Sequence, residues 1–255
     1  MASAFEIWID GRRFQTADAK VSVLDRGFLY GDSVFETLRT YDKRLFALDE
    51  HLERLANSAE RVFIQLPVTL GELKQQLIHA VKVSAFVECY VRVMVTRGQG
   101  ALGLDPQKSV SPLVVVIIAE LTLPPVQDYE NGISAVTFQA SRPADHTVAA
   151  GAKLGNYLVA VLGQKKAAEA GAKEALLVTA DGDVLEGATS NVFWVKGDTL
   201  ATVPVAAGIL AGITRAHVLA LAGDLGWTVA QRIPKLAELM SSEAVFISSS
   251  IRELV

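Results

Sequence analysis

Three segments of the chain combine residue types that support one kind of chemistry, and the first contains Lys153. Lys153 lies in A-G-A-K-L-G-N, among small residues that let a bulky planar ligand approach closely. An amine in such an apolar setting loses part of its solvation, so its pKa falls and it becomes nucleophilic toward an aldehyde. The alternative is a solvated surface lysine. The nucleophilic role of Lys153 is therefore predicted only in combination with the other two segments.

The second segment, D-G-D-V-L-E-G-A-T-S-N, places Glu186 at the end of a predicted strand. A carboxylate beside a pyridine nitrogen keeps that nitrogen protonated, and the ring can then accept electrons. Gly187 permits a sharp turn, and Ser190 and Asn191 could reach a ligand or brace the loop. The alternative is that Glu186 is a charged hairpin residue.

The third segment, G-I-L-A-G-I-T-R, has the features of an anion site at a helix start. Gly212 precedes Ile213 and Thr214, where free backbone N–H groups, the helix dipole and a hydroxyl would face the anion. The alternative is an ordinary capped helix. An amine nucleophile, a carboxylate for a ring nitrogen and a phosphate cradle together predict pyridoxal 5'-phosphate (PLP) as the cofactor, and we predict no metal ligands.

Further residues could hold the phosphate from other parts of the chain. Arg54, in H-L-E-R-L, could supply a bidentate clamp, although an exposed helix arginine is the alternative. Ser248, Ser249 and Ser250, near the end of the chain, could add hydroxyl groups, although they could also be a polar strand end.

The composition is that of an ordinary globular protein. The chain has 255 residues, of which 51% are hydrophobic and 20% charged, and its net charge is −4. No basic run indicates nucleic-acid binding, and the longest apolar run, Leu113 to Ala119, is too short to span a membrane. The single cysteine, Cys89, cannot form an internal disulfide, and the N-terminus does not resemble a signal peptide, so we expect a cytoplasmic protein.

The hydrophobic pattern predicts an α+β (mixed α/β) protein, because hairpins alternate irregularly with helices. A polar, proline-containing stretch suggests two domains, residues 1–121 and 132–255, joined by a linker at 122–131. Asp49 is the predicted N-cap of the first helix. Further helices are predicted over Leu70–Ser84, Asn156–Ala170 and Ile213–Leu225, and strands over Phe5–Ile9, Arg12–Phe14, Ser33–Tyr41, Val87–Thr96, Leu113–Ala119, Ile133–Ala140, Glu174–Thr179, Val184–Glu186, Asn191–Val195, Thr199–Val203 and Val245–Ile247.

The order of these motifs resembles that of the fold-type IV PLP enzymes, namely branched-chain aminotransferases, D-amino acid aminotransferases and 4-amino-4-deoxychorismate lyases. The resemblance runs through nearly the whole chain and includes L-Y-G-D-S-V-F-E-T-L-R from Leu29, D-E-H-L-E-R-L from Asp49 and V-T-R-G from Val95. It implies a homodimer of two-domain subunits with the cofactor between the domains. It also implies Lys153 as the Schiff-base lysine, Glu186 beside the pyridine nitrogen, Tyr157 near the phenolic oxygen, and Arg54, Ile213, Thr214 and Ser250 around the phosphate.

The residues expected around the substrate point to an aminotransferase. Tyr90 and Arg92 flank Val91 on a predicted strand and therefore face one way. They resemble the tyrosine–arginine pair of branched-chain aminotransferases, as Tyr30, Phe35 and Arg39 resemble other residues of that pocket. The alternative for the pair is a half-buried strand face.

Two signals about the substrate conflict. The stretch after T-R-G lacks the arginine and histidine that typical D-amino acid aminotransferases carry there, whereas E-G-A-T-S-N is closer to the D-specific and lyase sequences. The predicted reaction is amino-group exchange between an amino acid and a 2-oxo acid. The alternatives are a D-amino acid aminotransferase, an aminodeoxychorismate lyase and a catalytically silent PLP-binding regulator.

Overall fold

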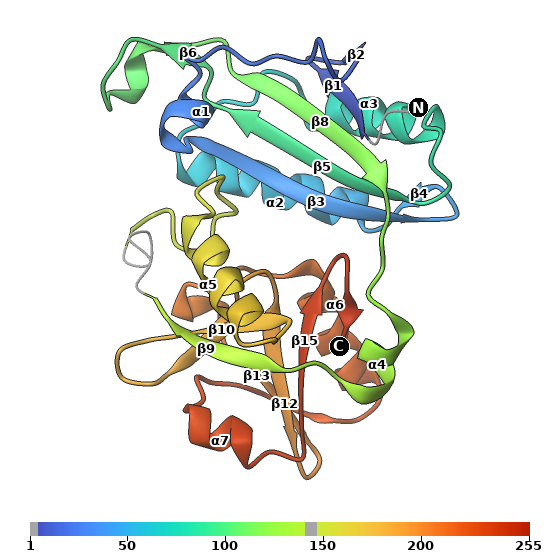
Figure 1. The fold of residues 1–255 in the computed structure, drawn as a ribbon, viewed down its shortest axis with the longest axis vertical. Coiled ribbons are helices and arrows are strands. Elements are labelled where there is room, and N and C mark those ends of the chain that lie inside the picture. The colour runs from blue at the N-terminus through green and yellow to red at the C-terminus, as the bar shows by residue number, and fades with distance from the viewer. Residues whose placement is uncertain (1–4, 141–146) are drawn as a thin grey trace. The chain divides into compact units, whose positions relative to one another are not determined.

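The computed structural model describes residues 5–140 and 147–255 (Figure 1). By their contacts these residues divide into unit 1, Met1–Thr122 with Ala152–Asn156, and unit 2, Leu123–Gly151 with Tyr157–Val255. The domain limits drawn from the sequence stay a prediction. The contacts also assign the short segment Ala152–Asn156, which contains Lys153, to unit 1. A division of the chain at a single point would not predict this.

Unit 1 is built on an antiparallel six-stranded sheet, and the described residues include no helix that could span a membrane. The strands predicted over Phe5–Ile9 and Arg12–Phe14 are confirmed, and they pair as a hairpin with Ile9 and Arg12 on either side of the turn. The sheet has the order β2-β1-β8-β5-β3-β4. Its strands are β1 (Phe5–Ile9), β2 (Arg12–Phe14), β3 (Ser33–Tyr41), β4 (Arg44–Leu45), β5 (Cys89–Thr96) and β8 (Leu113–Glu120), and the small hairpin β6 (Gln99–Gly100) with β7 (Ser109–Val110) lies beside it.

Two amphipathic helices, α2 (Leu48–Arg61) and α3 (Leu70–Lys82), cover one face of this sheet (Figure 1). Leucines of both helices pack on the valines of β5 and β8, so every second strand residue is buried. A capping box of Thr69 and Glu72 starts α3.

The prediction that Asp49 caps α2 was wrong. The helix begins at Leu48, and its N-cap is Ala47 in a left-handed conformation without a side-chain cap. Asp49 lies in the first turn instead, where its charge favours the helix dipole and pairs with Lys74.

Unit 2 contains two smaller sheets and the remaining long helices. One sheet has the order β11-β10-β9 and the other β14-β13-β12-β15-β16, and α5 packs on β9 and β10 (Figure 1). The strands are β9 (Ala135–Gln139), β10 (Glu174–Val178), β11 (Val184–Gly187), β12 (Asn191–Lys196), β13 (Thr199–Thr202), β14 (Thr228–Gln231), β15 (Ala244–Ser249) and β16 (Glu253–Leu254). The helices are α4 (Val126–Asn131), α5 (Leu158–Glu169), α6 (Ile213–Asp224) and α7 (Leu236–Met240).

Several short elements were not foreseen from the sequence. The polar stretch proposed as a linker contains α4, which is too short to show a helical period. The helix α1 (Arg26–Tyr30), the helix α7 and the strands β14 and β16 were missed for the same reason. The helix predicted from Asn156 begins only at Leu158, because residues 152–156 are extended and bonded to unit 1.

Residues 152–156 are attached to the edge of β3 by backbone hydrogen bonds. The N–H of Phe35 donates to the carbonyl of Lys153 at 3.1 Å, and the N–H of Gly155 donates to the carbonyl of Ser33 at 2.8 Å. A Cβ at Gly155 would lie 2.1 Å from Ser33 Oγ, so a larger residue would have to displace that hydroxyl. The sheet therefore fixes the backbone on both sides of Leu154.

Gly98, in the T-R-G motif, gives a test of the fold of unit 1. Its φ is +89°, and an added Cβ would lie 2.2 Å from the carbonyl oxygen of Ser111. Gly98→Ala should therefore lower the free energy of unfolding by at least about 2 kcal/mol in urea titrations. In the matched control, Gly71→Ala in α3, the nearest atom is 3.9 Å away, and stability should rise by about 0.5–1 kcal/mol. A Gly98→Ala protein as stable as the parent would contradict this description of the turn.

Candidate active site

Lys153 is half-buried, and its backbone is held on both sides. Its N–H donates to Ser58 Oγ at 3.1 Å, and its carbonyl accepts from Phe35. Its Nζ lies 4.7 Å from the centroid of the Phe35 ring, and the guanidinium carbon of Arg92 lies 3.9 Å from the same centroid. One buried aromatic ring thus contacts both the predicted nucleophile and a predicted substrate-binding arginine.

The predicted substrate residues of β3 and β5 share one face of the sheet. Val34 and Leu38 point into the core with α2, so Phe35 and Arg39 point to the opposite face. In the register of β3 with β5, Arg39 is opposite Tyr90, which places Tyr90 and Arg92 on that same face. The structure brings these four residues together, and Arg39 also stacks on Tyr41 at 4.2 Å.

Tyr30 lies apart from this face, at the end of α1. Its hydroxyl accepts a hydrogen bond from the N–H of Gly103 at 3.1 Å, and the guanidinium of Arg26 lies over its ring at 5.0 Å. The loop that follows T-R-G therefore determines the position of the Tyr30 hydroxyl.

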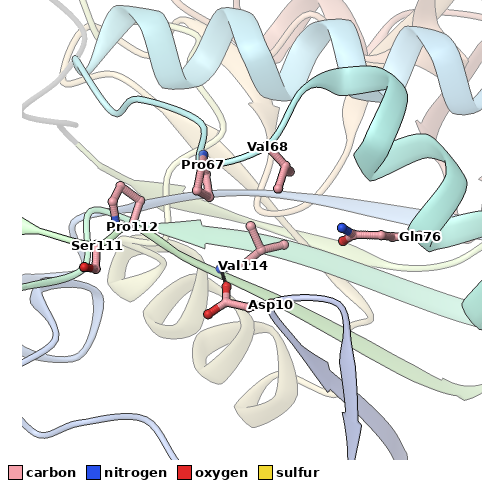
Figure 2. Close-up of a pocket in the computed structure, with 7 residues that line it drawn as sticks. All are labelled: Asp10, Pro67, Val68, Gln76, Ser111, Pro112 and Val114. Atoms are coloured by element: carbon pink, nitrogen blue, oxygen red, sulfur yellow. Dashed lines mark hydrogen bonds between the residues drawn. The ribbon is translucent and has the colours of Figure 1, made fainter.

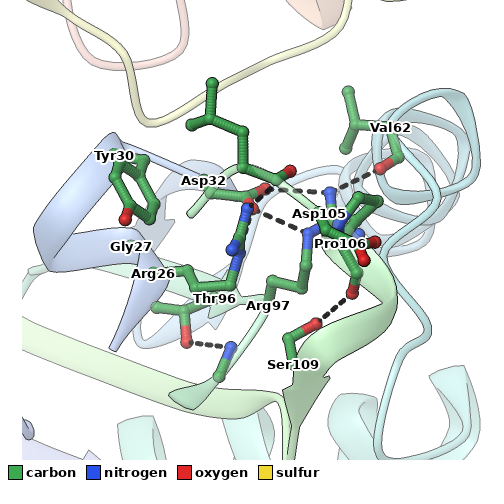
Figure 3. Close-up of polar contacts among 12 residues, drawn as sticks. Arg26, Gly27, Tyr30, Asp32, Val62, Thr96, Arg97, Asp105, Pro106 and Ser109 are labelled. Carbon is green, nitrogen blue, oxygen red and sulfur yellow. Dashed lines mark hydrogen bonds and ion pairs between the residues drawn. The ribbon is translucent and has the colours of Figure 1, made fainter. Parts of the chain in front are cut away.

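Asp32 joins the two motifs Y-G-D and T-R-G (Figure 3). Its carboxylate accepts from Arg97 at 2.7 and 2.9 Å and from Arg26 at 2.9 Å. Burial opposes ionisation, but the hydrogen bonds from Arg97 and Arg26 outweigh it and lower the pKa of Asp32. Arg97 also donates to the carbonyls of Val62 and Phe63, at the end of α2. The Y-G-D and T-R-G motifs, which are far apart in the sequence, therefore meet in one ion-pair cluster.

Arg54, the predicted phosphate clamp, lies on α2 and is bound to Glu36. Its Nε and Nη2 donate to the two oxygens of the Glu36 carboxylate at 2.6 and 2.7 Å. His51 Nδ1 lies 2.8 Å from the same carboxylate, and Glu36 is fully buried. The sequence analysis did not identify Glu36 or His51 as site residues. His51 lies three residues before Arg54 in E-H-L-E-R, a spacing that places both side chains on one face of a helix.

The charge states of this cluster follow from burial and hydrogen bonding. Burial alone would raise the pKa of Glu36, but hydrogen bonds from Arg54 and His51 lower it from 4.5 to about 2. Burial lowers the pKa of His51, so its ring is neutral at pH 7. An ionised carboxylate only accepts hydrogen bonds, and His51 must therefore donate its Nδ1–H to Glu36.

In unit 2, Glu186 and Asn191 hold the backbone of the same residue, Leu210, in the loop before α6. Glu186 Oε2 accepts from the N–H of Leu210 at 3.0 Å, and Asn191 Nδ2 donates to the carbonyl of Leu210 at 2.9 Å. Both side chains are buried. The two predicted cofactor residues thus position the G-I-L-A-G-I-T-R segment.

The start of α6 has the properties expected of a phosphate cradle. Gly212 is its N-cap and supplies no side-chain cap, and a Cβ there would lie 1.9 Å from Asn191 Oδ1. The first-turn N–H groups of Ile213 and Thr214 therefore face no capping side chain from position 212. Ser248, on the neighbouring strand β15, has a buried Oγ with no hydrogen-bond partner among the described residues. These donors fit the phosphate of PLP.

Glu174 is a buried residue that the sequence analysis missed, and it holds the loop after Glu186. Its carboxylate accepts from the Ser190 hydroxyl at 2.9 Å, the Ala188 N–H at 3.2 Å and Gln164 at 3.0 Å, and it also pairs with Arg252. Gly187 leaves room for the Ser190–Glu174 hydrogen bond, because a Cβ there would lie 2.1 Å from Ser190 Oγ. Ser190 thus braces the loop, one of the two roles considered for it.

The remaining predicted residues also lie in unit 2. Ser249 Oγ accepts from the N–H of Arg252 at 3.1 Å. This bond connects the turn at Ser248–Ser250, called the serine turn below, to Arg252, a partner of Glu174. Ser250 follows it at the turn after β15, and Tyr157 is the N-cap residue of α5. Glu174 was missed because a single charged residue at the start of an apolar strand does not form a motif that indicates a function.

A surface pocket of about 320 Å³ lies elsewhere in unit 1 (Figure 2). It is lined by Asp10, Pro67, Val68, Gln76, Ser111, Pro112 and Val114. None of these is a predicted site residue, and the Asp10 carboxylate is bonded to the N–H of Val114. The pocket therefore gives no support for a catalytic role.

Comparison with known proteins identifies the family. The sequence profile described as amino-transferase class IV matches residues 33–255. The chain belongs to the class IV aminotransferase family. This confirms the predicted family, the α+β fold of fold type IV, and an aminotransferase enzyme.

The relatives include branched-chain aminotransferases and D-alanine aminotransferases. A Methanocaldococcus jannaschii protein, provisionally named a branched-chain-amino-acid aminotransferase, is 39% identical over 98% of this chain and 86% of its own. A D-alanine aminotransferase of Bacillus licheniformis is 34% identical over 98% and 86% of the two chains. The branched-chain aminotransferase of Escherichia coli is 30% identical over 97% and 82%.

Solved structures show the same fold. The Escherichia coli branched-chain aminotransferase superimposes with a TM-score of 0.92 at 30% identity, over 99% of this chain and 85% of that one. A T.th. branched-chain aminotransferase, in complex with N-(5'-phosphopyridoxyl)-L-glutamate, gives 0.90 at 31% identity, over 99% and 84%.

The Glu36 cluster predicts a pH-dependent contribution to stability. A carboxyl group whose pKa is lowered on folding stabilises the fold above its unfolded pKa, and this contribution disappears as the pH falls from about 4.5 to about 2. Glu36→Gln should therefore be less stable than the parent by about 3 kcal/mol at pH 7, and the gap should narrow below pH 4.5 in urea titrations.

Glu53→Gln, on the exposed side of α2, is the control and should change stability by less than about 0.5 kcal/mol. A stability gap for Glu36→Gln that stays constant between pH 7 and pH 3 would show that the carboxylate charge does not stabilise the fold.

Proposed function

We propose that this aminotransferase uses PLP to exchange an amino group between a branched-chain or other small hydrophobic amino acid and a 2-oxo acid such as 2-oxoglutarate. The observation that carries the proposal is the environment of Lys153. Its amine lies over Phe35, on the sheet face that also carries Arg39, Tyr90 and Arg92. A nucleophilic amine beside cations that could bind a carboxylate suits an amino acid substrate.

Residues from each of the three sequence motifs are proposed to hold the cofactor. When bound, PLP supplies an aldehyde that reacts with amines and a ring that accepts the electron pair of the substrate α-carbon. Lys153 would hold the cofactor and move the α-proton, and Glu186 would keep a proton on the ring nitrogen. The phosphate would be held by Arg54, the N–H groups of Ile213 and Thr214, and the serine turn. Other cofactor contacts would come from Tyr157, Ser190, Asn191, Gly212, Ser249 and Ser250.

The side chains on the substrate face suit a small amino acid with an apolar side chain. Arg92 and Arg39 would hold its carboxylate, because guanidinium groups recognise carboxylates bidentately. Tyr90 on this face, and Tyr30 from the end of α1, would contact its side chain, since aromatic rings bury apolar groups well. Phe35 is only 1% exposed, so its contribution is to shape the wall under Arg92 and Lys153.

A second candidate is a D-amino acid aminotransferase. The Bacillus licheniformis relative is named a D-alanine aminotransferase, and its 34% identity exceeds the 30% of the Escherichia coli branched-chain enzyme. The loop after T-R-G favours the first candidate, because it lacks an arginine and histidine.

The family resemblance also supports a homodimer. The single cysteine, Cys89, is buried and burial raises the pKa of its thiol, which suits a structural residue in a reducing compartment such as the cytoplasm.

A half-reaction screen tests the proposed function. The purified protein, loaded with PLP, should lose its visible absorption when mixed with L-leucine, L-valine or L-isoleucine, as the cofactor converts to its amine form. Addition of 2-oxoglutarate should restore it. Lys153→Ala should slow both steps by several orders of magnitude, since nucleophile and proton carrier are lost together.

Other outcomes of the screen identify the alternatives. Conversion by D-alanine alone would mean a D-amino acid aminotransferase, and release of pyruvate from aminodeoxychorismate would mean the lyase. Retained PLP with no response to any of these substrates would favour the silent regulator and overturn the proposal.

Glu186→Gln separates the role of the carboxylate charge from its role in the fold. The amide oxygen of glutamine can still accept from the Leu210 N–H, so the loop and PLP binding should survive. An amide cannot stabilise a protonated ring nitrogen, so removal of the α-proton should slow by about a hundredfold, or about 3 kcal/mol. Single-turnover kinetics with α-deuterated leucine would measure this rate. Normal turnover of Glu186→Gln would make the carboxylate a loop brace only.

A further inference from the structure

Arg215, the third residue of α6, is a buried cation without an acidic partner among the residues that the structure describes. It is 5% exposed. Its Nη2 donates to the carbonyl of Val203 and to Gln231 Oε1, both at 2.9 Å, and its Nε is buried without a partner. All the acceptors that it has are neutral.

Several other buried charges among the described residues have a partner of opposite charge, which Arg215 lacks. Glu36 is paired with Arg54, Arg26 with Asp32, and Glu174 with Arg252. Burial lowers the pKa of Arg215, because its charged form is poorly solvated inside the protein. The first turn of a helix is also the positive end of its dipole, where a cation is disfavoured. An arginine with both disadvantages and no carboxylate needs an anion from elsewhere.

The surroundings of Arg215 indicate where that anion would bind. The first turn of α6 has no side-chain cap, because Gly212 is its N-cap and Asn191 fills the space of a Cβ. Ser248, whose buried Oγ has no described partner, is paired in register with Asn191. Arg215 Nε and Ser248 Oγ are the two unpartnered buried side-chain atoms in the described part of unit 2, and both belong to residues near this turn.

We propose that Arg215 supplies a further positive charge to the phosphate site at the start of α6, in addition to Arg54, and acts on the bound phosphate through space. This rests on the proposed PLP-dependent function and deepens it. Helix geometry keeps the guanidinium within about 10 Å of the first-turn N–H groups. At that range a buried cation stabilises a dianion appreciably, because little water screens the pair. The phosphate in turn relieves the unfavourable burial of the arginine.

A purely structural role for Arg215 makes a different prediction. If it only braces α6 against Val203 and Gln231, then its removal should weaken the binding of any ligand of the site equally. A through-space charge should affect only ligands that carry the phosphate. PLP and pyridoxal differ in the phosphate alone, so their relative affinities separate the two roles.

The experiment measures the affinities of PLP and pyridoxal for the intact protein after removal of cofactor, by absorbance titration at pH 8. Arg215→Gln should raise the Kd of PLP at least about tenfold and leave that of pyridoxal within about twofold. Arg215→Lys should restore most of the PLP affinity, because it keeps the charge. The matched control is Arg232→Gln, since Arg232 is exposed and paired with Glu238, and it should bind both ligands like the parent.

The pH dependence gives a second readout. The phosphate loses its second proton near pH 6, so the ratio of the Kd values of Arg215→Gln and parent for PLP should shrink between pH 8 and pH 5.5. Arg215→Met is prepared alongside, because it is similar in length and buries no polar atom. Either variant that folds provides the test.

Three results would overturn the inference while leaving the proposed function intact: unchanged PLP affinity in Arg215→Gln and Arg215→Met, equal losses for PLP and pyridoxal, or failure of both variants to fold. A parent protein that binds neither ligand would instead overturn the proposed function.

Discussion

The hydrogen bonds that attach residues 152–156 to β3 are the constraint on which the site depends. They place a segment from the second half of the chain on the sheet of the first half, with the Lys153 amine over Phe35. Gly155 allows the close approach, and Ser58 of α2 holds the Lys153 N–H from the other side. Because both neighbouring peptides are fixed, the lysine side chain has a defined starting point from which to reach a ligand.

Three carboxylates, of which Glu36 and Glu174 are fully buried, hold charged side chains and a loop of the site. Glu36 orients Arg54, Asp32 joins Arg26 to Arg97, and Glu174 binds the loop that follows Glu186. A buried carboxylate is tolerated only when donors surround it, so each cluster fixes several backbone segments at once. Arg215 departs from this pattern, since the described residues offer it no carboxylate, and the departure is what points to a bound anion.

Local patterns allowed much of the fold to be predicted from the sequence. Alternation in β5 correctly placed Tyr90 and Arg92 on one face, and the glycine-rich motifs marked the turn after Glu186 and the start of α6. Interactions between distant residues were beyond such patterns. The Asp32–Arg97 pair and the Glu174–Ser190 bond depend on tertiary packing, and the short helices α1, α4 and α7 contain too few residues to show a period.

The most direct test of the account is the chemical location of the cofactor. Borohydride reduction of the PLP-loaded protein should fix the cofactor irreversibly to the amine that binds it, and peptide mass spectrometry should find the added mass on Lys153 alone. The structure predicts this because Lys153 is held by the β3 edge and Ser58. Label on another lysine, or none after reduction, would contradict the assignment of Lys153 on which the site was built.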